Sequence, residues 1–309
     1  MTISPQNMEP VSASPPASGL QENLEIADKL REAGALLEAQ AASPYRAGAY
    51  RKAAETLARL ERPVRAIFDA DGVEGLDALP HIGRGIAGAV AEMLISGRWN
   101  QLERWRGELD PVQLFQSVPG IGPQLAQRIH DALHIDTLEA LEAAAHDGRL
   151  EGVLGVGTRR AAAWRAVLSG MLKRLRPRDR AAQPPGAILP SIADLVEVDR
   201  EYRRGAEARS LPTIAPKRFN PEGEAWLPVL HTARGGWHYT VLYSNTANAH
   251  KLNRTRDWVV VYFYDDEHVE GQCTVVTETR GPMTGSRVVR GREPECRRFY
   301  AQEAAPPSA

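Results

Sequence analysis

The sequence predicts a multidomain protein with an all-α amino-terminal half and a smaller α+β domain that contains an antiparallel sheet. Three observations predict this fold class. Apolar residues recur at helical spacing in the first 172 residues, short β-branched and aromatic runs follow residue 236, and a basic run containing proline separates the two parts. A chain of 309 residues is long enough for two or three domains with ample core.

The chain divides into six segments where composition changes or where residues that interrupt regular structure gather. They are a disordered leader rich in Pro and Ser (1–20), a helical domain (21–110), a second helical region (111–175), a linker (176–190), an α+β domain (191–300) and a disordered tail (301–309). The basic run "KRLRPRDRAAQPPG" (173–186) predicts a solvated tether that could add non-specific phosphate contacts.

A glycine turn in the second helical region, "SVPGIGPQLAQRI" (117–129), separates two apolar runs. Gly120 and Gly122, on either side of Ile121, permit a tight backbone that side chains would obstruct. Pro123 suits the first turn of a helix, because its missing N–H costs nothing there. The stretch predicts a helix, a sharp turn and a second helix whose free N–H groups face outward, which makes an anion site.

The same turn recurs twice more in the helical half. The further copies are "LPHIGRGIAGAV" (79–90), with Gly83 and Gly85, and "VLGVGTRRAAAW" (153–164), with Gly155 and Gly157. His81 takes the position of Gly120 in the first copy, and histidine tolerates positive φ better than most residues. One copy could be only a tight corner with an apolar residue in the core, but three copies about 35 to 40 residues apart indicate an internal repeat. The repeat favours a surface that holds a nucleic-acid backbone without reading bases.

Residues around the first copy carry a family resemblance. They are Asn23, Ile26-Ala27-Asp28, Pro44-Tyr45-Arg46 and Ala49-Tyr50-Arg51-Lys52-Ala53-Ala54, followed by the 79–90 copy and "ISGRWNQLERW" (95–105). This region resembles the small amino-terminal domain of family X DNA polymerases, and 112–172 is similar to the helix-hairpin-helix region that follows it there. The resemblance implies binding of gapped or nicked DNA. It places Arg46 and Tyr50 near a downstream 5′-phosphate and Arg51 among the DNA-binding residues.

Two activities of that family are not indicated by the sequence. Polymerisation needs a Gly-Ser and a spaced pair of aspartates that hold two magnesium ions. The only acidic cluster after residue 175, "YDDEH" (264–268), has adjacent aspartates, which point to opposite faces of a strand. The lyase reaction of the family uses lysines on the helix after the first hairpin, where this chain has Gly85 and Ala89. We therefore expect a binding protein more than an enzyme.

Charge is divided unevenly between the two parts. The net charge is −1, with 17 Lys+Arg and 22 Asp+Glu in residues 1–172 against 21 and 17 in residues 173–309. Hairpins that bind through backbone amides need few cations, so the acidic half is compatible with DNA binding of modest affinity.

The remaining composition predicts a cytoplasmic protein. Two cysteines, Cys273 and Cys296, fit a reduced compartment, no apolar run approaches 18 residues, and no signal peptide opens the sequence. We expect DNA as the partner and no membrane, and the sequence indicates no protein partner. No metal site is indicated, and no cofactor beyond a monovalent cation that could bridge the hairpins to phosphate.

The α+β domain carries no recognised chemistry. "SIADLVEVDREYRRGAEA" (191–208) predicts an amphipathic helix capped by Ser191, and the predicted strands are 237–244, 258–264, 273–279 and 286–291. The candidate groups for a Cys–His nucleophile are His231, His238 and His250 with Cys273 or Cys296, although a buried structural thiol is the simpler interpretation. Cations and aromatics interleave between Lys217 and Arg256, which suits either a single-strand groove or a core with solvated arginines.

The sequence thus predicts a DNA-binding protein that grips the phosphate backbone of structured, gapped or damaged DNA, in DNA repair or related DNA metabolism. The alternative is a DNA-processing enzyme, a nuclease or a lyase, whose active site lies in residues 191–300. Polar groups that converge in a cleft beside the hairpins would favour the alternative.

Overall fold

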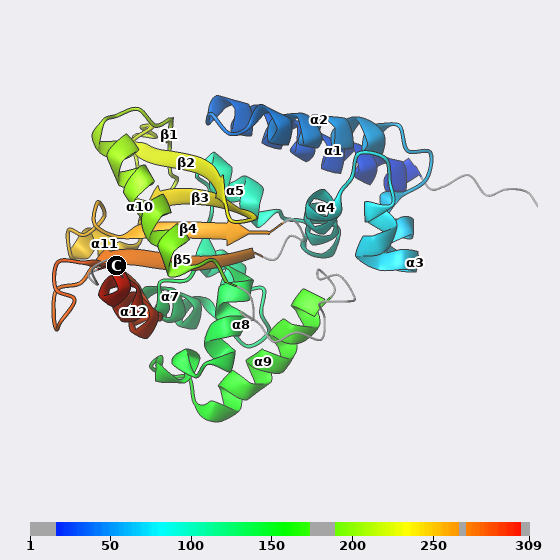
Figure 1. Ribbon diagram of the computed structural model, residues 1–309. Coiled ribbons are helices and arrows are strands. Elements are labelled where there is room, and N and C mark those ends of the chain that lie inside the picture. Colours follow the sequence, from blue (N-terminus) through cyan, green and yellow to red (C-terminus); the bar gives the residue numbers. More distant parts are fainter. Residues whose placement is uncertain (1–16, 174–188, 266–269, 304–309) are drawn as a thin grey trace, which may run out of the picture.

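The computed structural model describes residues 17–173, 189–265 and 270–303 (Figure 1). Most of the predicted leader, nearly all of the predicted linker with its basic run, and residues 304–309 lie outside the described residues. In the described ranges, no helix combines the length and the apolar character that crossing a membrane requires.

The first helical region packs around one core. Its helices are α1 (Ala17–Ala39), α2 (Pro44–Ala58), α3 (Val64–Asp77), α4 (Arg84–Ser96) and α5 (Asn100–Arg106). Fully buried alanines, among them Ala27, Ala47 and Ala53, let α1 and α2 lie close together (Figure 1). Asn23 on α1 fixes the start of α3, because its Oδ1 accepts from the Val64 amide at 2.8 Å.

The second helical region has a core of its own. Its elements are α6 (Pro111–Phe115), α7 (Pro123–Leu133), α8 (Leu138–His146), the 3₁₀ turn η1 (Arg149–Gly152) and α9 (Thr158–Lys173). Leu125, Ala126 and Ile129 of α7 are buried in this core together with Phe115 and Leu168. The helical spacing of the 117–129 stretch therefore predicted the buried face of α7 correctly.

Six strands form one antiparallel sheet in sequence order. They are β1 (Thr213–Ile214), β2 (Leu227–Arg234), β3 (Trp237–Tyr243), β4 (Val259–Tyr264), β5 (Glu270–Thr277) and β6 (Arg287–Val289), joined in this part of the chain by α10 (Ile192–Glu207), α11 (Ala247–Lys251) and α12 (Glu293–Glu303). The predicted strands correspond to β3 to β6 and the predicted helix to α10, where the Ser191 Oγ accepts from the Asp194 amide at 3.0 Å. Strands β1 and β2 were not predicted from the sequence. The predicted fold class is confirmed.

Both faces of the sheet are covered, and every residue of β4 is buried. On one face, Tyr202 of α10 donates to the Pro228 carbonyl at 3.0 Å, and its ring lies 4.9 Å from that of Tyr243. On the other face, Tyr262 of β4 meets Arg104 of α5 and Asp136 after α7. An antiparallel sheet commonly leaves one face in water. Here the helical half covers that face, so the two parts of the chain share an interface.

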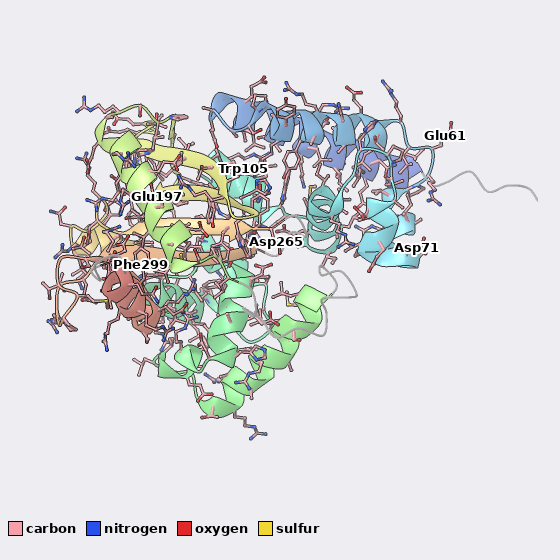
Figure 2. The ribbon with its side chains drawn as sticks, in the orientation of Figure 1. Glu61, Asp71, Trp105, Glu197, Asp265 and Phe299 are labelled. Atoms are coloured by element: carbon pink, nitrogen blue, oxygen red, sulfur yellow. The ribbon has the colours of Figure 1, made fainter. Side chains whose placement is uncertain are left out.

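His231 on β2 joins the sheet to the first helical region. Its Nε2 lies 2.8 Å from Gln40 Oε1, and the Gln40 amide donates to the Trp105 carbonyl at 2.7 Å. Figure 2 shows Trp105 at this junction between α5 and the sheet. Burial lowers the pKa of His231 to about 3, so the ring is neutral at physiological pH.

We expect acid to destabilise this junction. A histidine in the unfolded chain takes up a proton below about pH 6.5, whereas folded His231 stays neutral down to about pH 3. The contribution of the neutral ring to the free energy of unfolding is therefore lost as pH falls from 6.5 toward 3. Proton linkage lowers that free energy by about 2 kcal/mol between pH 7 and pH 5. Chemical denaturation at both pH values should show a smaller loss for H231Q than for the wild type. An identical pH dependence in the two proteins would contradict the assignment.

Candidate nucleic-acid interface

The three hairpin turns share one backbone conformation. A residue with positive φ comes first, then a buried apolar residue, then a glycine: His81 (φ 61°), Ile82 and Gly83; Gly120 (φ 85°), Ile121 and Gly122; Gly155 (φ 92°), Val156 and Gly157. The left-handed region favours glycine and admits histidine only at some cost. His81 therefore occupies the conformation that the glycines of the other two copies adopt, which confirms the internal repeat at the level of the backbone.

The middle residue of each turn anchors it in a core. Ile82, Ile121 and Val156 are 2%, 4% and 6% exposed. The amide of each donates to the carbonyl three residues earlier, at 3.2 Å, 3.0 Å and 2.9 Å respectively. Ile121 is thus a buried structural residue, and the flanking glycines are the groups that face solvent.

The last glycine of each turn is the residue before a helix. Gly83 and Gly122 have extended φ/ψ values of −87°/173° and −83°/172°, and neither offers a side-chain hydrogen bond to its helix. A Cβ added at Gly83, Gly122 or Gly157 would meet nothing within 4 Å. Pro123 has no N–H, and the amides of Leu125 and Arg160 donate to the Gly122 and Gly157 carbonyls at 3.1 Å and 2.9 Å. The amides left without an intrahelical acceptor at these exposed turns therefore include those of the first two residues of α4 and α9 and that of Gln124 in α7.

Four other helices begin with a side-chain cap at the residue before the helix, whereas α2, α3 and α5 lack one, as α4 and α7 do. Side chains of Asp110, Thr137, Ser191 and Thr246 accept hydrogen bonds from the first amides of α6, α8, α10 and α11. Such caps stabilise a helix by about 1 kcal/mol relative to alanine. The hairpin helices lack this cap, which leaves their amides available to an external acceptor.

The residue before the positive-φ position fixes each turn through its carbonyl. The Pro80 carbonyl accepts from Thr56 Oγ1 at 2.8 Å, the Pro119 carbonyl from Trp164 Nε1 at 3.1 Å, and the Leu154 carbonyl from Arg128 Nη1 at 3.0 Å. In each case the donor belongs to a neighbouring helix, so each turn is held from outside as well as by its buried middle residue.

The second and third hairpins form a reciprocal pair. Trp164 on the helix of the third hairpin holds the second turn, and Arg128 on the helix of the second hairpin holds the third. The first hairpin instead belongs to the core of the first helical region and is held by Thr56 of α2. The structure thus brings two of the three predicted hairpins into direct contact.

Two carbonyls of the third hairpin that could bind the predicted monovalent cation already accept hydrogen bonds from arginines. Its Leu154 and Gly155 carbonyls accept from the guanidinium groups of Arg128 and Arg160, both at 3.0 Å. A cation that used these carbonyls would have to displace two arginines. At the other hairpins the cation remains a prediction.

The predicted residues of α2 and α4 lie in three different environments. Tyr50 is 5% exposed and donates to Gln101 Oε1 at 3.3 Å, and burial raises its pKa. Its hydroxyl is therefore buried in this structure, whereas the family resemblance predicts a place near a downstream 5′-phosphate. Arg46 is half-buried, with its guanidinium 5.0 Å from the ring of Tyr264, whereas Arg51 is exposed and paired with Glu38. Gly85 is half-buried in the first turn of α4.

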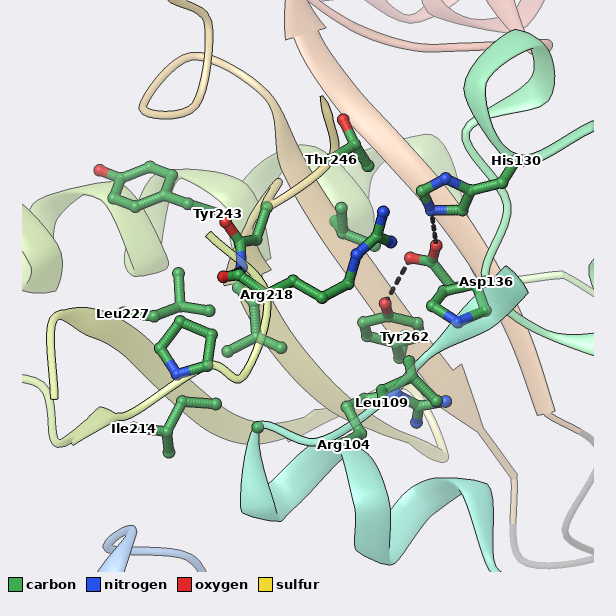
Figure 3. Close-up of a pocket in the computed structure, with 16 residues that line it drawn as sticks. Arg104, Leu109, His130, Asp136, Ile214, Arg218, Leu227, Tyr243, Thr246 and Tyr262 are labelled. Carbon is green, nitrogen blue, oxygen red and sulfur yellow. Dashed lines mark hydrogen bonds and ion pairs between the residues drawn. The ribbon is translucent and has the colours of Figure 1, made fainter. Parts of the chain in front are cut away.

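A pocket of about 80 Å³ lies on the face of the sheet that the helical half covers (Figure 3). Its polar lining includes Arg104, His130 and Asp136 from the helical half and Arg218 and Tyr262 from the α+β domain. Figure 3 shows the Arg218 side chain reaching across the pocket toward His130 and Asp136. The α+β domain and the tandem hairpins therefore build this pocket together.

Asp136 is the centre of a buried hydrogen-bond network beside the pocket. Its Oδ1 lies 2.9 Å from His130 Nε2, and its Oδ2 accepts from the Tyr262 hydroxyl at 2.6 Å and from Gln272 Nε2 at 3.1 Å. Burial alone would raise the pKa of Asp136, but the hydrogen bonds from His130 and Tyr262 outweigh it and lower that pKa. Burial raises the pKa of Tyr262 well above its usual value, so Tyr262 remains a proton donor.

Arg104 and Glu270 form a buried ion pair next to this network. Arg104 Nη1 lies 2.5 Å from Glu270 Oε1, and their side chains are only 2% and 8% exposed. The guanidinium lies 3.7 Å from the ring centroid of Tyr262. Sequence reasoning identified none of Arg104, His130, Asp136 and Tyr262, because they come from separate segments and follow no local motif.

Three of the five predicted Cys–His candidates have partners other than one another. His231 bonds to Gln40, and His250 bonds to Asn245 at 2.6 Å. Cys296 is buried and accepts from the Val289 amide, as a structural thiol would. Trp237, predicted as either a groove or a core residue, is buried in the sheet core. Within the described ranges there is no group of three or more His, Cys, Asp or Glu residues placed to hold a metal ion.

Two family models match the helical half. The helix-hairpin-helix domain matches residues 21–99, and the SAM-like helix-hairpin-helix tandem matches residues 112–169. No curated protein matches this chain. The matches support a helix-hairpin-helix protein, and helix-hairpin-helix domains are generally DNA-binding.

Proposed function

We propose that this chain holds the phosphate backbone of structured, gapped or damaged DNA through its hairpins, in DNA repair or related DNA metabolism. One observation carries the proposal. Three helices begin after an exposed glycine, which offers no side chain to cap their first amides, although the same chain caps four other helices with side chains. Free amides at a helix start bind anions such as phosphate.

The reciprocal pair of hairpins suits a duplex. The two strands of a duplex are antiparallel, so a local two-fold axis relates the phosphates on either side of a groove. Two hairpins that exchange equivalent contacts can each hold one strand. Contacts of this kind fix position on the duplex and carry no base sequence.

Charge around the third hairpin supports the same proposal. Arg128, Arg159 and Arg160 are exposed close to its turn. These cations give the acidic helical half a local basic surface where a phosphate would lie.

The finer parts of the proposal come from the family resemblance. A resemblance of residues 21–175 to the amino-terminal region of family X DNA polymerases supports a preference for gaps and nicks and a place in repair. Free Cys273 and Cys296 agree with a cytoplasmic setting. We also propose the domain boundaries predicted from the sequence, with the α+β domain as a distinct unit that packs on the hairpin region.

A DNA-processing enzyme is the second candidate function. The pocket favours it, because polar groups of the α+β domain converge there with His130 of α7, the helix that the second hairpin begins. His130 lies eight positions after Gly122, so at a rise of 1.5 Å per residue the two are about 12 Å apart along the helix. In this candidate, Arg218 would hold a phosphate of the DNA.

Binding and cleavage assays separate the two candidates. We expect the full chain to bind nicked and gapped duplexes more tightly than intact duplex, and to leave all three uncut with or without Mg²⁺. Affinity by fluorescence anisotropy and product analysis on denaturing gels measure both. Cleavage that R218A abolishes would establish the enzyme, and the absence of binding to any of the three would refute both candidates.

A further inference from the structure

Leu154 is a large apolar side chain at the tip of the third hairpin, and it is 80% exposed. Its neighbours Val153 and Val156 are 3% and 6% exposed, so the turn buries its other apolar residues. Single exposed leucines are common on protein surfaces. Leu154 differs because its backbone is fixed on both sides.

Three hydrogen bonds fix this tip. Arg128 Nη1 donates to the Leu154 carbonyl and Arg160 Nη1 donates to the Gly155 carbonyl, both at 3.0 Å, and the Val156 amide donates to the Val153 carbonyl at 2.9 Å. The leucine side chain is therefore presented from a rigid position beside the start of α9. Little backbone entropy therefore remains to be lost when the leucine enters a binding site.

The same position is different in the other two hairpins. Pro80 and Pro119 occupy it, and both are exposed with their carbonyls held in the same way as that of Leu154. The proline ring is compact and stays close to the backbone, whereas the leucine side chain extends away from it. The tandem pair is thus asymmetric at its tips, with one apolar projection.

We propose that Leu154 inserts into the duplex at a base step and makes the tandem hairpins selective for DNA with a weakened step. The inference rests on the proposed function, which places the hairpins on the phosphates of the two strands. A tip between those phosphates faces the groove, and apolar side chains that insert there unstack a base step. Unstacking costs the least free energy at a nick, gap or mismatch. A single inserted leucine therefore gives hairpins that bind only the backbone a preference for DNA with such a weakened step.

A fluorescent base tests this insertion in the full chain. The DNA is a nicked duplex with 2-aminopurine next to the nick, compared with an intact duplex carrying the same base. The variants are L154A and L154P, the second of which restores the residue of the other hairpins. L252A is the matched control, because Leu252 is a 52% exposed leucine of the α+β domain.

Wild type and L252A should raise 2-aminopurine fluorescence on the nicked duplex and bind it about tenfold more tightly than the intact one. L154A and L154P should lose the fluorescence rise and bind the two duplexes within about twofold of each other, with unchanged melting temperatures. Binding by wild type without a fluorescence rise, or a rise that both variants retain, would overturn the role of Leu154 and leave the hairpin function standing. Failure of the wild type to bind either duplex would refute the proposed function itself, and the insertion with it.

Discussion

R104M is expected to lower the free energy of unfolding by about 3 to 5 kcal/mol, because it leaves Glu270 buried without its partner. Arg104 Nη1 and Glu270 Oε1 are 2.5 Å apart in the interface between α5 and the sheet, and both side chains are almost fully buried. The substitution also removes the cation that lies 3.7 Å from the ring centroid of Tyr262. Chemical denaturation followed by tryptophan fluorescence measures the loss.

Arg51 supplies the matched control for this prediction. It also pairs with a glutamate, Glu38, but the two side chains are 47% and 61% exposed. Exposed pairs contribute about 0 to 1 kcal/mol, so R51M should cost little. The double variant R104M/E270L, which removes both charges, should recover most of the stability that R104M loses. Equal losses for R104M and R51M would show that the buried pair does not hold the interface together.

The hairpins could be predicted from the sequence because their determinants are local. Gly120 and Gly155 adopt the positive φ values that favour glycine, and Ile121 and Val156 fill the core at fixed spacing from them. His81 takes the corresponding position of the first hairpin and also adopts a positive φ, 61°. Each determinant lies within a few residues of the others, so a short stretch carries the full signal.

The pocket could not be predicted because its contacts join distant segments. Tyr262 and Asp136, which hydrogen bond, are 126 residues apart, and Gln272 and Asp136 are 136 apart. The missed strand β2 has Pro228 near its start, and its burial pattern is irregular. One signal was present in the sequence: "WVVVYFY" (258–264) has no polar alternation, which is typical of a strand buried on both faces. That pattern indicates that both faces of the sheet are covered, but it does not identify the helical half as the part that covers the face opposite α10.

The glycines before the hairpin helices provide no cap, so we expect them to lower the stability of these helices while leaving amides open to DNA phosphates. In G122D/G157D, the new carboxylates would cap α7 and α9, since Gly122 has the extended conformation of a cap residue and both sites have open space for a Cβ. A carboxylate near a helix start is also favoured by the helix dipole. The melting temperature should therefore stay the same or rise slightly.

The same carboxylates would occupy the amides and repel phosphate. Hydrogen bonds to a charged group contribute about 1.5 to 3 kcal/mol each, so losing one at each of two hairpins predicts at least about a 100-fold loss of affinity. G122N/G157N adds a similar cap without the charge and should give a smaller loss. G170D places the same charge in α9 away from the turn, where a Cβ meets nothing within 4 Å, and should bind nearly as the wild type does.

The affinity of full-length G122D/G157D for a nicked duplex, measured by fluorescence anisotropy beside wild type and G170D, tests the central claim most directly. Binding through the free amides of the hairpin helices predicts about a 100-fold weaker complex for the double variant, at an unchanged melting temperature. Affinity within about twofold of the wild type in the folded double variant would show that the hairpin amides do not hold the DNA.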